Sequence, residues 1–149
     1  MPRRTAPDEH APSRAFVDSS AWFAVASASD GRHAEAERLL GDAVARGIGL
    51  LTTNLILAEV HRLALARMGI RPAATMLERI EASRLVSLVH ATAEHHRSAR
   101  GWLAKLPDQR ISYVDAVSFA VIEDTRCPLV MTFDRHFEMA GFRVWRVVG

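Results

Sequence analysis

Four acidic residues, far apart along the chain, occupy positions from which they could act together on one ligand: Asp18, Glu59, Asp115 and Asp134. Two of them follow short apolar runs that are typical of buried strands, and two lie in the early turns of expected helices. In open parallel α/β sheets, ligands sit at the edge formed by the carboxyl ends of the strands. We therefore expect the four carboxylates to converge at that edge.

A cluster of this kind suits a divalent cation. Ionised carboxylates crowded at one edge repel one another and raise one another's pKa. A hard cation such as Mg²⁺ or Mn²⁺ removes that penalty and prefers oxygen ligands. A bound ion generates hydroxide from water and offsets charge on phosphate oxygens, so the pocket suits phosphate-ester hydrolysis. Thr132, together with Ser19 or Ser20, is expected to hydrogen-bond a carboxylate or a metal-bound water.

Each carboxylate also has a structural explanation of its own. Asp18 can cap the helix that follows it, and Asp134 can cap a short helix. Asp115 lies three residues after a serine, which is the spacing of a capping box. Glu59 interrupts a mainly apolar helical stripe, where a salt bridge to Arg62 would account for it. Only convergence of the four residues would favour a metal site over these local roles.

The histidines and the one cysteine point to no second type of metal site. His95 and His96 fall on an amphipathic helix, and we expect both to be solvated. His136 lies nearer the acidic residues, where packing or support of a ligand is expected. No His/Cys spacing typical of zinc is present. Cys127 precedes an expected buried strand, which favours a packing role over a reactive one. A chain with a single cysteine cannot form an internal disulfide, so we expect it to function in the reducing interior of the cell.

Strands and helices alternate along the sequence. Apolar or alternating runs predict strands, and periodic apolar positions predict helices. We expect strands at 15–17, 48–52, 85–89 (an edge strand), 129–133 and 142–148, and helices at 21–26, 33–46, 54–68, 72–80, 91–106, 112–125 and 136–140. Thr53 or Asn54 is expected to cap the third helix. This alternation predicts a three-layer α/β/α domain with a mostly parallel central sheet.

Length and composition fit one globular domain. The 149 residues are 49% hydrophobic and 24% charged, and no apolar run approaches the ~20 residues of a membrane span. Residues 1–13 contain three prolines and are expected to be a disordered tail, followed by one domain at 14–149. The tail has no apolar segment of the kind that a secretion signal needs, so we expect a cytoplasmic protein without a membrane association.

The basic residues add a weak indication of partners. The net charge of +2 does not by itself argue for nucleic acid, and Lys105 is the only lysine. Arginine suits bidentate contact with phosphate, although codon usage is the simpler explanation of this bias. If bound cations neutralise the four carboxylates, the rest of the surface is more basic than +2 suggests.

Four segments carry a resemblance to a known family. They read FVDSSAW (16–22), TNLILAEV (53–60), SYVDA (112–116) and TFDRHF (132–137), in this order, and they span the chain from about residue 15 to its end. The chain thereby resembles PIN-domain ribonucleases, and among these the toxins of VapBC-type toxin–antitoxin pairs. Its small size and the absence of an extra domain favour the toxin over larger RNA-processing relatives.

The resemblance implies a function and a set of site residues. It maps the family's acidic quartet onto Asp18, Glu59, Asp115 and Asp134, with Thr132 as the accompanying hydroxyl. It implies Mg²⁺ or Mn²⁺, endonucleolytic cleavage of RNA, a homodimer, and inhibition by a cognate antitoxin whose tail covers the active-site groove. Many members carry Asn two residues after the first Asp, where this chain has Ser20. We expect this departure to affect a polar contact that supports the acidic residues, and not the binding of the metal itself.

Two other functional classes remain open at this point. The domain could be a catalytically inactive PIN-like module that binds RNA or protein, which metal titration would distinguish. A phosphotransfer domain would need a lysine at a strand end, whereas Lys105 lies in an expected helix. For an antitoxin, apolar residues of the first two helices either expose a groove or belong to the core: Trp22, Phe23, Leu39, Leu40 and Val44.

Overall fold

The computed structural model describes residues 14–147, so the predicted disordered tail at 1–13 lies outside the described residues. A sheet of four parallel strands forms the centre, in the order β3-β2-β1-β4. The strands are β1 (Arg14–Val17), β2 (Gly49–Thr53), β3 (Val86–Val89) and β4 (Leu129–Met131). Because all four strands run in one direction, their carboxyl ends share one edge, as the sequence predicts.

Seven helices in the described chain cover the sheet. They are α1 (Ser19–Ala26), α2 (His33–Arg46), α3 (Asn54–Met68), α4 (Ile70–Ala82), α5 (Ala93–Lys105), α6 (Tyr113–Thr125) and α7 (Arg135–Met139). The longest, α3, has 15 residues, and between residues 14 and 147 no helix is both long and apolar enough to cross a bilayer.

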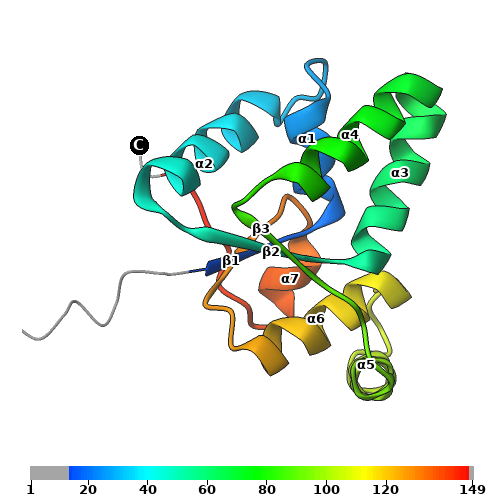
Figure 1. Ribbon diagram of the computed structural model, residues 1–149. Coiled ribbons are helices and arrows are strands. Elements are labelled where there is room, and N and C mark those ends of the chain that lie inside the picture. Colours follow the sequence, from blue (N-terminus) through cyan, green and yellow to red (C-terminus); the bar gives the residue numbers. More distant parts are fainter. Residues whose placement is uncertain (1–13, 148–149) are drawn as a thin grey trace, which may run out of the picture.

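The strand order explains how the helices divide into two layers. From β1 through β2 to β3 the chain moves across the sheet in one direction, and from β3 it returns past β1 to β4. Since crossovers between parallel strands are right-handed, a reversal of direction places the later helices on the opposite face. Figure 1 shows α1 to α4 on one face and α5 to α7 on the other. The predicted three-layer α/β/α fold is confirmed.

Strand burial follows strand position. Ala15, Phe16 and Val17 of the central strand β1 are completely buried, as expected of a strand covered by helices on both faces. β3 lies at the sheet edge, and its Ser87 and Leu88 are exposed. The predicted edge position is therefore confirmed, but burial does not alternate along β3, because these two exposed residues are adjacent.

The end of the chain departs from prediction. β4 stops at Met131 instead of residue 133, and the predicted last strand at 142–148 is reduced to one parallel bridge between Val130 and Val144. Val130 donates to the carbonyl of Arg143 (2.9 Å) and accepts from Trp145 (2.8 Å). Because β4 has only three residues, it offers this segment little more than one residue to pair with.

Aromatic packing fixes the turn that carries Asp134. Phe137 of α7 is completely buried and packs between Phe119 of α6 and Phe16 of β1, with ring centroids 5.1 and 6.5 Å apart. Removing a buried Phe side chain typically costs about 3–5 kcal/mol. A helix as short as α7 has little stability of its own, so this anchor holds it, and the residues before it, at the sheet edge.

Candidate metal centre

The structure brings the four predicted acidic residues to one place. Asp18 follows β1, Asp134 follows β4, and Glu59 and Asp115 lie near the amino ends of α3 and α6. In Figure 1 these helix ends meet the carboxyl ends of β1 and β2 at the right side of the sheet. The charges of Asp134 and Glu59 both raise the pKa of Asp115, and Asp115 raises that of Asp18. The four carboxylates thus act on one another across a single pocket.

Asp18 is the most enclosed of the four, with 2% of its surface exposed. Its Oδ1 accepts hydrogen bonds from the Ser20 hydroxyl (2.7 Å) and the Ala21 amide (3.1 Å), and its Oδ2 accepts from the Thr132 hydroxyl (2.7 Å). The predicted cap of α1 is therefore present as well. Burial raises the pKa of Asp18 to about 7 even though these three hydrogen bonds lower it.

Asp115 lies in the first turn of α6 and is 8% exposed. Its backbone N–H donates to the Ser112 hydroxyl (3.0 Å), so the predicted capping relation involves the main chain of Asp115. Burial raises the pKa of its carboxyl, and the charges of Asp134 and Glu59 raise it further, against a smaller opposing effect of His136. Capping and a place in the acidic pocket are thus compatible in this residue.

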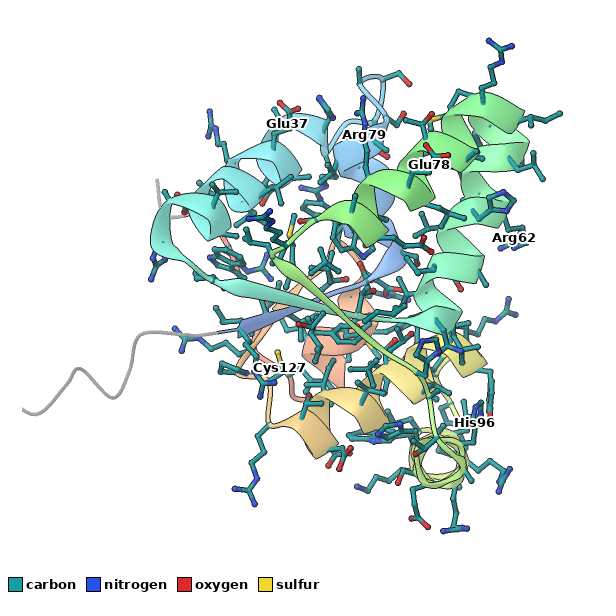
Figure 2. The ribbon with its side chains drawn as sticks, viewed as in Figure 1. Glu37, Arg62, Glu78, Arg79, His96 and Cys127 are labelled. Atoms are coloured by element: carbon teal, nitrogen blue, oxygen red, sulfur yellow. The ribbon has the colours of Figure 1, made fainter. Side chains whose placement is uncertain are left out.

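Glu59 does not form the salt bridge that its helical neighbours suggested. Its Oε1 accepts a hydrogen bond from the Ser19 hydroxyl, 40 residues away in sequence. No ion pair joins Glu59 to Arg62 among the described residues, and Figure 2 shows Arg62 pointing outward from α3. The alternative explanation of Glu59 by a salt bridge to Arg62 is therefore not supported, and Ser19 is the partner of Glu59.

Hydroxyl groups connect Asp18 to the loop that carries Asp134. Thr132 donates to Asp18 and accepts from the Asp134 amide (2.9 Å), while Ser20 donates to Asp18 and accepts from the Phe133 amide (2.9 Å). Both hydroxyls were expected to contact a carboxylate, but the bridge from Ser20 to Phe133 was not. The only sequence signal for it is a hydroxyl in the first turn after Asp18.

His136 extends the pocket beyond carboxylates. Its Nδ1 lies 3.1 Å from Asp134 Oδ1 and 3.5 Å from Asp115 Oδ2, and it has no hydrogen-bond partner although it is buried. Ligand atoms of Asp115, Asp134 and His136 lie within 4.8 Å of one another. Crowded carboxylates next to an unpaired imidazole nitrogen form a donor set that fits a divalent cation.

His95 corrects another expectation. It is 6% exposed rather than solvated. Its Nδ1 accepts from the Thr92 amide (3.0 Å), completing the capping box of α5, and its Nε2 lies 2.8 Å from Asp124 Oδ2 on α6. His96 is half-buried and stacks on Tyr113, with ring centroids 5.6 Å apart. Helical periodicity placed both residues on a polar face, but α6 packs against that face.

Cys127 behaves as a packing residue. It is buried just before β4, where Figure 2 labels it, and its thiol contacts the Leu129 carbonyl at 3.6 Å. Burial raises the pKa of this thiol, which keeps it protonated and unreactive near neutral pH.

The apolar residues considered for an antitoxin groove divide into three groups. Phe23 and Leu39 are core residues, and Val44 is 61% exposed. Trp22 and Leu40 line a cavity of about 560 Å³ between α1, α2 and α4. Its other lining residues are mostly apolar, and the polar ones are Arg71, Thr75 and Arg79 of α4 and Ser83 directly after that helix.

Comparison with known proteins supports the resemblance seen in the sequence. The family model of the PIN domain matches residues 15–143. The 23S rRNA-specific endonuclease VapC20 of Mycobacterium tuberculosis (strain H37Rv) is 36% identical over 127 residues, which cover 85% of this chain and 94% of VapC20.

Solved structures agree with that match. The crystal structure of VapC20, described as a sarcin-ricin loop cleaving toxin, superposes with a TM-score of 0.81 at 35% identity, covering 89% of this chain and 98% of VapC20. FitAcB from Neisseria gonorrhoeae gives a TM-score of 0.63 at 14% identity, over 88% of this chain and 96% of that protein. The second likeness bears on the fold alone.

Proposed function

The chain belongs to the PIN-domain family, and from this we propose that it is a metal-dependent RNA endonuclease acting as the toxin of a type II toxin–antitoxin system. The observation that carries the proposal is the convergence of four carboxylates whose burial and mutual repulsion raise the pKa of Asp18 and Asp115. Such an arrangement costs stability unless a cation is bound, which is typical of a functional site.

In this proposal Asp18, Glu59, Asp115 and Asp134 hold Mg²⁺ or Mn²⁺. When bound, the ion supplies a water of lowered pKa and offsets charge on the phosphate oxygens. Thr132 and Ser20 hold the carboxylate of Asp18 from two sides, and Ser19 holds Glu59. Because these donors are fixed before substrate arrives, little reorganisation is needed in the reaction.

Proton transfer also falls to the carboxylates. The described chain has no cysteine or lysine at this edge, since Cys127 lies at the start of β4 and Lys105 lies in α5. A water molecule that is oriented or deprotonated by a carboxylate can attack the phosphate directly, so neither a cysteine nor a lysine nucleophile is needed.

For the substrate we propose the sarcin-ricin loop of 23S rRNA, by similarity to VapC20, whose length the match covers almost completely. Sequencing the RNA ends that appear after induction of the protein tests this proposal. Ends concentrated at one position in that loop are expected. Ends confined to transfer RNA or messenger RNA would reject the substrate and leave the nuclease proposal intact.

For partners we propose a homodimer and a cognate antitoxin. The apolar cavity between α1, α2 and α4 suits the apolar face of an antitoxin segment, and Arg71 and Arg79 favour acidic residues beside it. Co-expression of the antitoxin is expected to relieve growth arrest, and Leu40→Asp to prevent that relief without preventing arrest. Light scattering of the purified protein measures whether it is a dimer.

The nuclease proposal is tested by cleavage of purified ribosomal RNA. We expect cleavage with Mg²⁺ or Mn²⁺, no cleavage in excess EDTA, and none by Asp115→Asn. Undiminished cleavage in EDTA would contradict the proposal. Saturable RNA binding without cleavage in any divalent cation would favour the inactive binding module instead.

A further inference from the structure

We infer that His136 is a ligand of the metal ion through Nδ1, and that this nitrogen biases the centre toward Mn²⁺ over Mg²⁺. The inference rests on the proposed metal-dependent function and adds a residue to the four acids. The geometry that carries it is a buried imidazole nitrogen that lies 3.1 Å from Asp134 and 3.5 Å from Asp115 and makes no hydrogen bond.

The first step concerns the unpaired nitrogen. Among the side chains of residues 14–147, His136 Nδ1 is the one buried polar atom that lacks a hydrogen bond. A buried polar atom without a hydrogen-bond partner lowers stability, and such atoms are rare in proteins. A metal ion that accepts the lone pair of Nδ1 would supply the missing partner.

The second step concerns distance. Neighbouring ligands of an octahedral ion with bonds of about 2.1 Å are separated by roughly 3.0 Å. Nδ1 lies 3.1 Å from Asp134 Oδ1 and 3.5 Å from Asp115 Oδ2. Both oxygens thus lie near the separation from Nδ1 that is expected of ligands sharing one ion, and the three ligand atoms lie within 4.8 Å of one another.

The third step concerns how firmly the imidazole is held. The backbone N–H of His136 donates to Asp134 Oδ1 (2.9 Å), which fixes the first turn of α7. The next residue, Phe137, is completely buried between α6 and β1. These two contacts keep the His136 side chain, of which 17% is exposed, directed at the acids. Its position therefore does not depend on an ion being present.

The ligand type then predicts metal preference. Mg²⁺ is bound in proteins almost entirely by oxygen, whereas imidazole is a good ligand for transition metals. Replacing one oxygen or water ligand by Nδ1 therefore favours Mn²⁺. The alternative is that His136 is protonated and donates to Asp115 or Asp134, acting only as a countercharge. A protonated imidazole would repel Mn²⁺ and Mg²⁺ alike, so it would not discriminate between them.

Pulsed electron paramagnetic resonance on the full chain loaded with Mn²⁺ separates these alternatives. We expect ¹⁴N modulation from a directly bound nitrogen, and its replacement by ¹⁵N signals when the protein is labelled with ¹⁵N-histidine. No variant is required for this measurement. Mn²⁺ that binds without nitrogen coupling would overturn the inference and leave the proposed nuclease unaffected.

Calorimetric titration with each metal alone gives a second readout. His136→Gln is expected to weaken Mn²⁺ binding about tenfold or more and Mg²⁺ binding less than about threefold. His90→Gln, which changes an exposed histidine, serves as the matched control and should leave both affinities unchanged. An equal loss for the two metals would overturn the inference. If neither ion binds the wild-type chain and RNA is cut in EDTA, the proposed function fails as well.

Discussion

Two polar clusters of this protein contain a histidine, and they are built in opposite ways. Between α5 and α6, His95 has a donor at Nδ1 and a carboxylate at Nε2, so both ring nitrogens have partners. At the sheet edge, His136 stands among carboxylates that repel one another, and its Nδ1 has no partner. We call the first the α5–α6 cluster (Thr92, His95 and Asp124) and the second the acidic pocket (Asp18, Glu59, Asp115, Asp134 and His136).

The difference separates structural roles from functional ones. A cluster that serves stability pairs donors with acceptors and opposite charges, because unpaired polar groups are costly. A cluster that holds a cation gathers like charges and leaves ligand atoms unpaired. Capping alone does not separate the two, since Asp18 and Asp134 cap helices and still belong to the acidic pocket.

The largest expected effect is on catalysis. Asp115→Asn should lower RNA cleavage at saturating Mg²⁺ by at least about a hundredfold, because the site loses one ligand of the ion and one negative charge. Asp124→Asn is the matched control from the α5–α6 cluster and should leave cleavage within about twofold. Equal losses from both would mean that the acidic pocket has no special role.

The second-largest expected effect is a gain in stability of the metal-free protein when Asp18 is replaced. With a pKa of about 7 in the folded state and 3.8 ordinarily, Asp18 holds a proton that the unfolded chain has lost between those pH values. The free energy of unfolding of the metal-free protein should therefore fall as pH rises from about 4 to about 7. Asp18→Asn removes this loss and should raise stability at pH 8 by about 1–3 kcal/mol.

Urea unfolding of both proteins in EDTA at pH 5 and pH 8 measures this effect. The advantage of the Asn variant should be less than half as large at pH 5 as at pH 8. Saturating Mn²⁺ should reverse it, since only the wild type binds the ion tightly. A large loss of stability from Asp18→Asn at pH 8 without metal would indicate that capping is the main role of this residue.

A substitution in the α5–α6 cluster should lower stability instead of raising it, and it should leave RNA cleavage nearly unchanged. His95→Gln is expected to lower the free energy of unfolding by about 1–2 kcal/mol, because the capping bond from the Thr92 amide is lost. Asp124 is largely exposed, so its ion pair contributes little. RNA cleavage should stay within about twofold at a temperature where the variant is folded. A hundredfold loss there would place His95 in the functional machinery.

The smallest effect concerns the hydroxyl that bridges Asp18 and the loop after β4. Ser20→Ala should lower cleavage about threefold to tenfold, because Asp18 Oδ1 and the Phe133 amide each lose a partner. Ser29→Ala removes an exposed hydroxyl with a single serine partner and serves as the control. If Ser20→Ala cleaves RNA like the wild type, Thr132 alone suffices to position Asp18.

Sequence reasoning predicted the order of the elements and the convergence of the four acidic residues for related reasons, while it assigned His136 only to packing or support of a ligand. Apolar periodicity separates strands from helices, and parallel strands bring distant residues such as Asp18 and Asp134 to one edge. Sequence reasoning failed where a polar side chain has several possible hydrogen-bond partners. Neither the contact of Ser19 with Glu59 nor the burial of His95 against α6 follows from local pattern, because both depend on how helices pack. The last strand was overpredicted because β4 is short.

Calorimetric titration of Mn²⁺ tests most directly whether the four carboxylates share one cation. We expect saturable binding to the wild type, and an affinity lowered at least about tenfold by each of Asp18→Asn, Glu59→Gln, Asp115→Asn and Asp134→Asn, with Asp124→Asn unaffected. A wild-type chain that binds no Mn²⁺, or four variants that bind it as tightly as the wild type, would contradict the account.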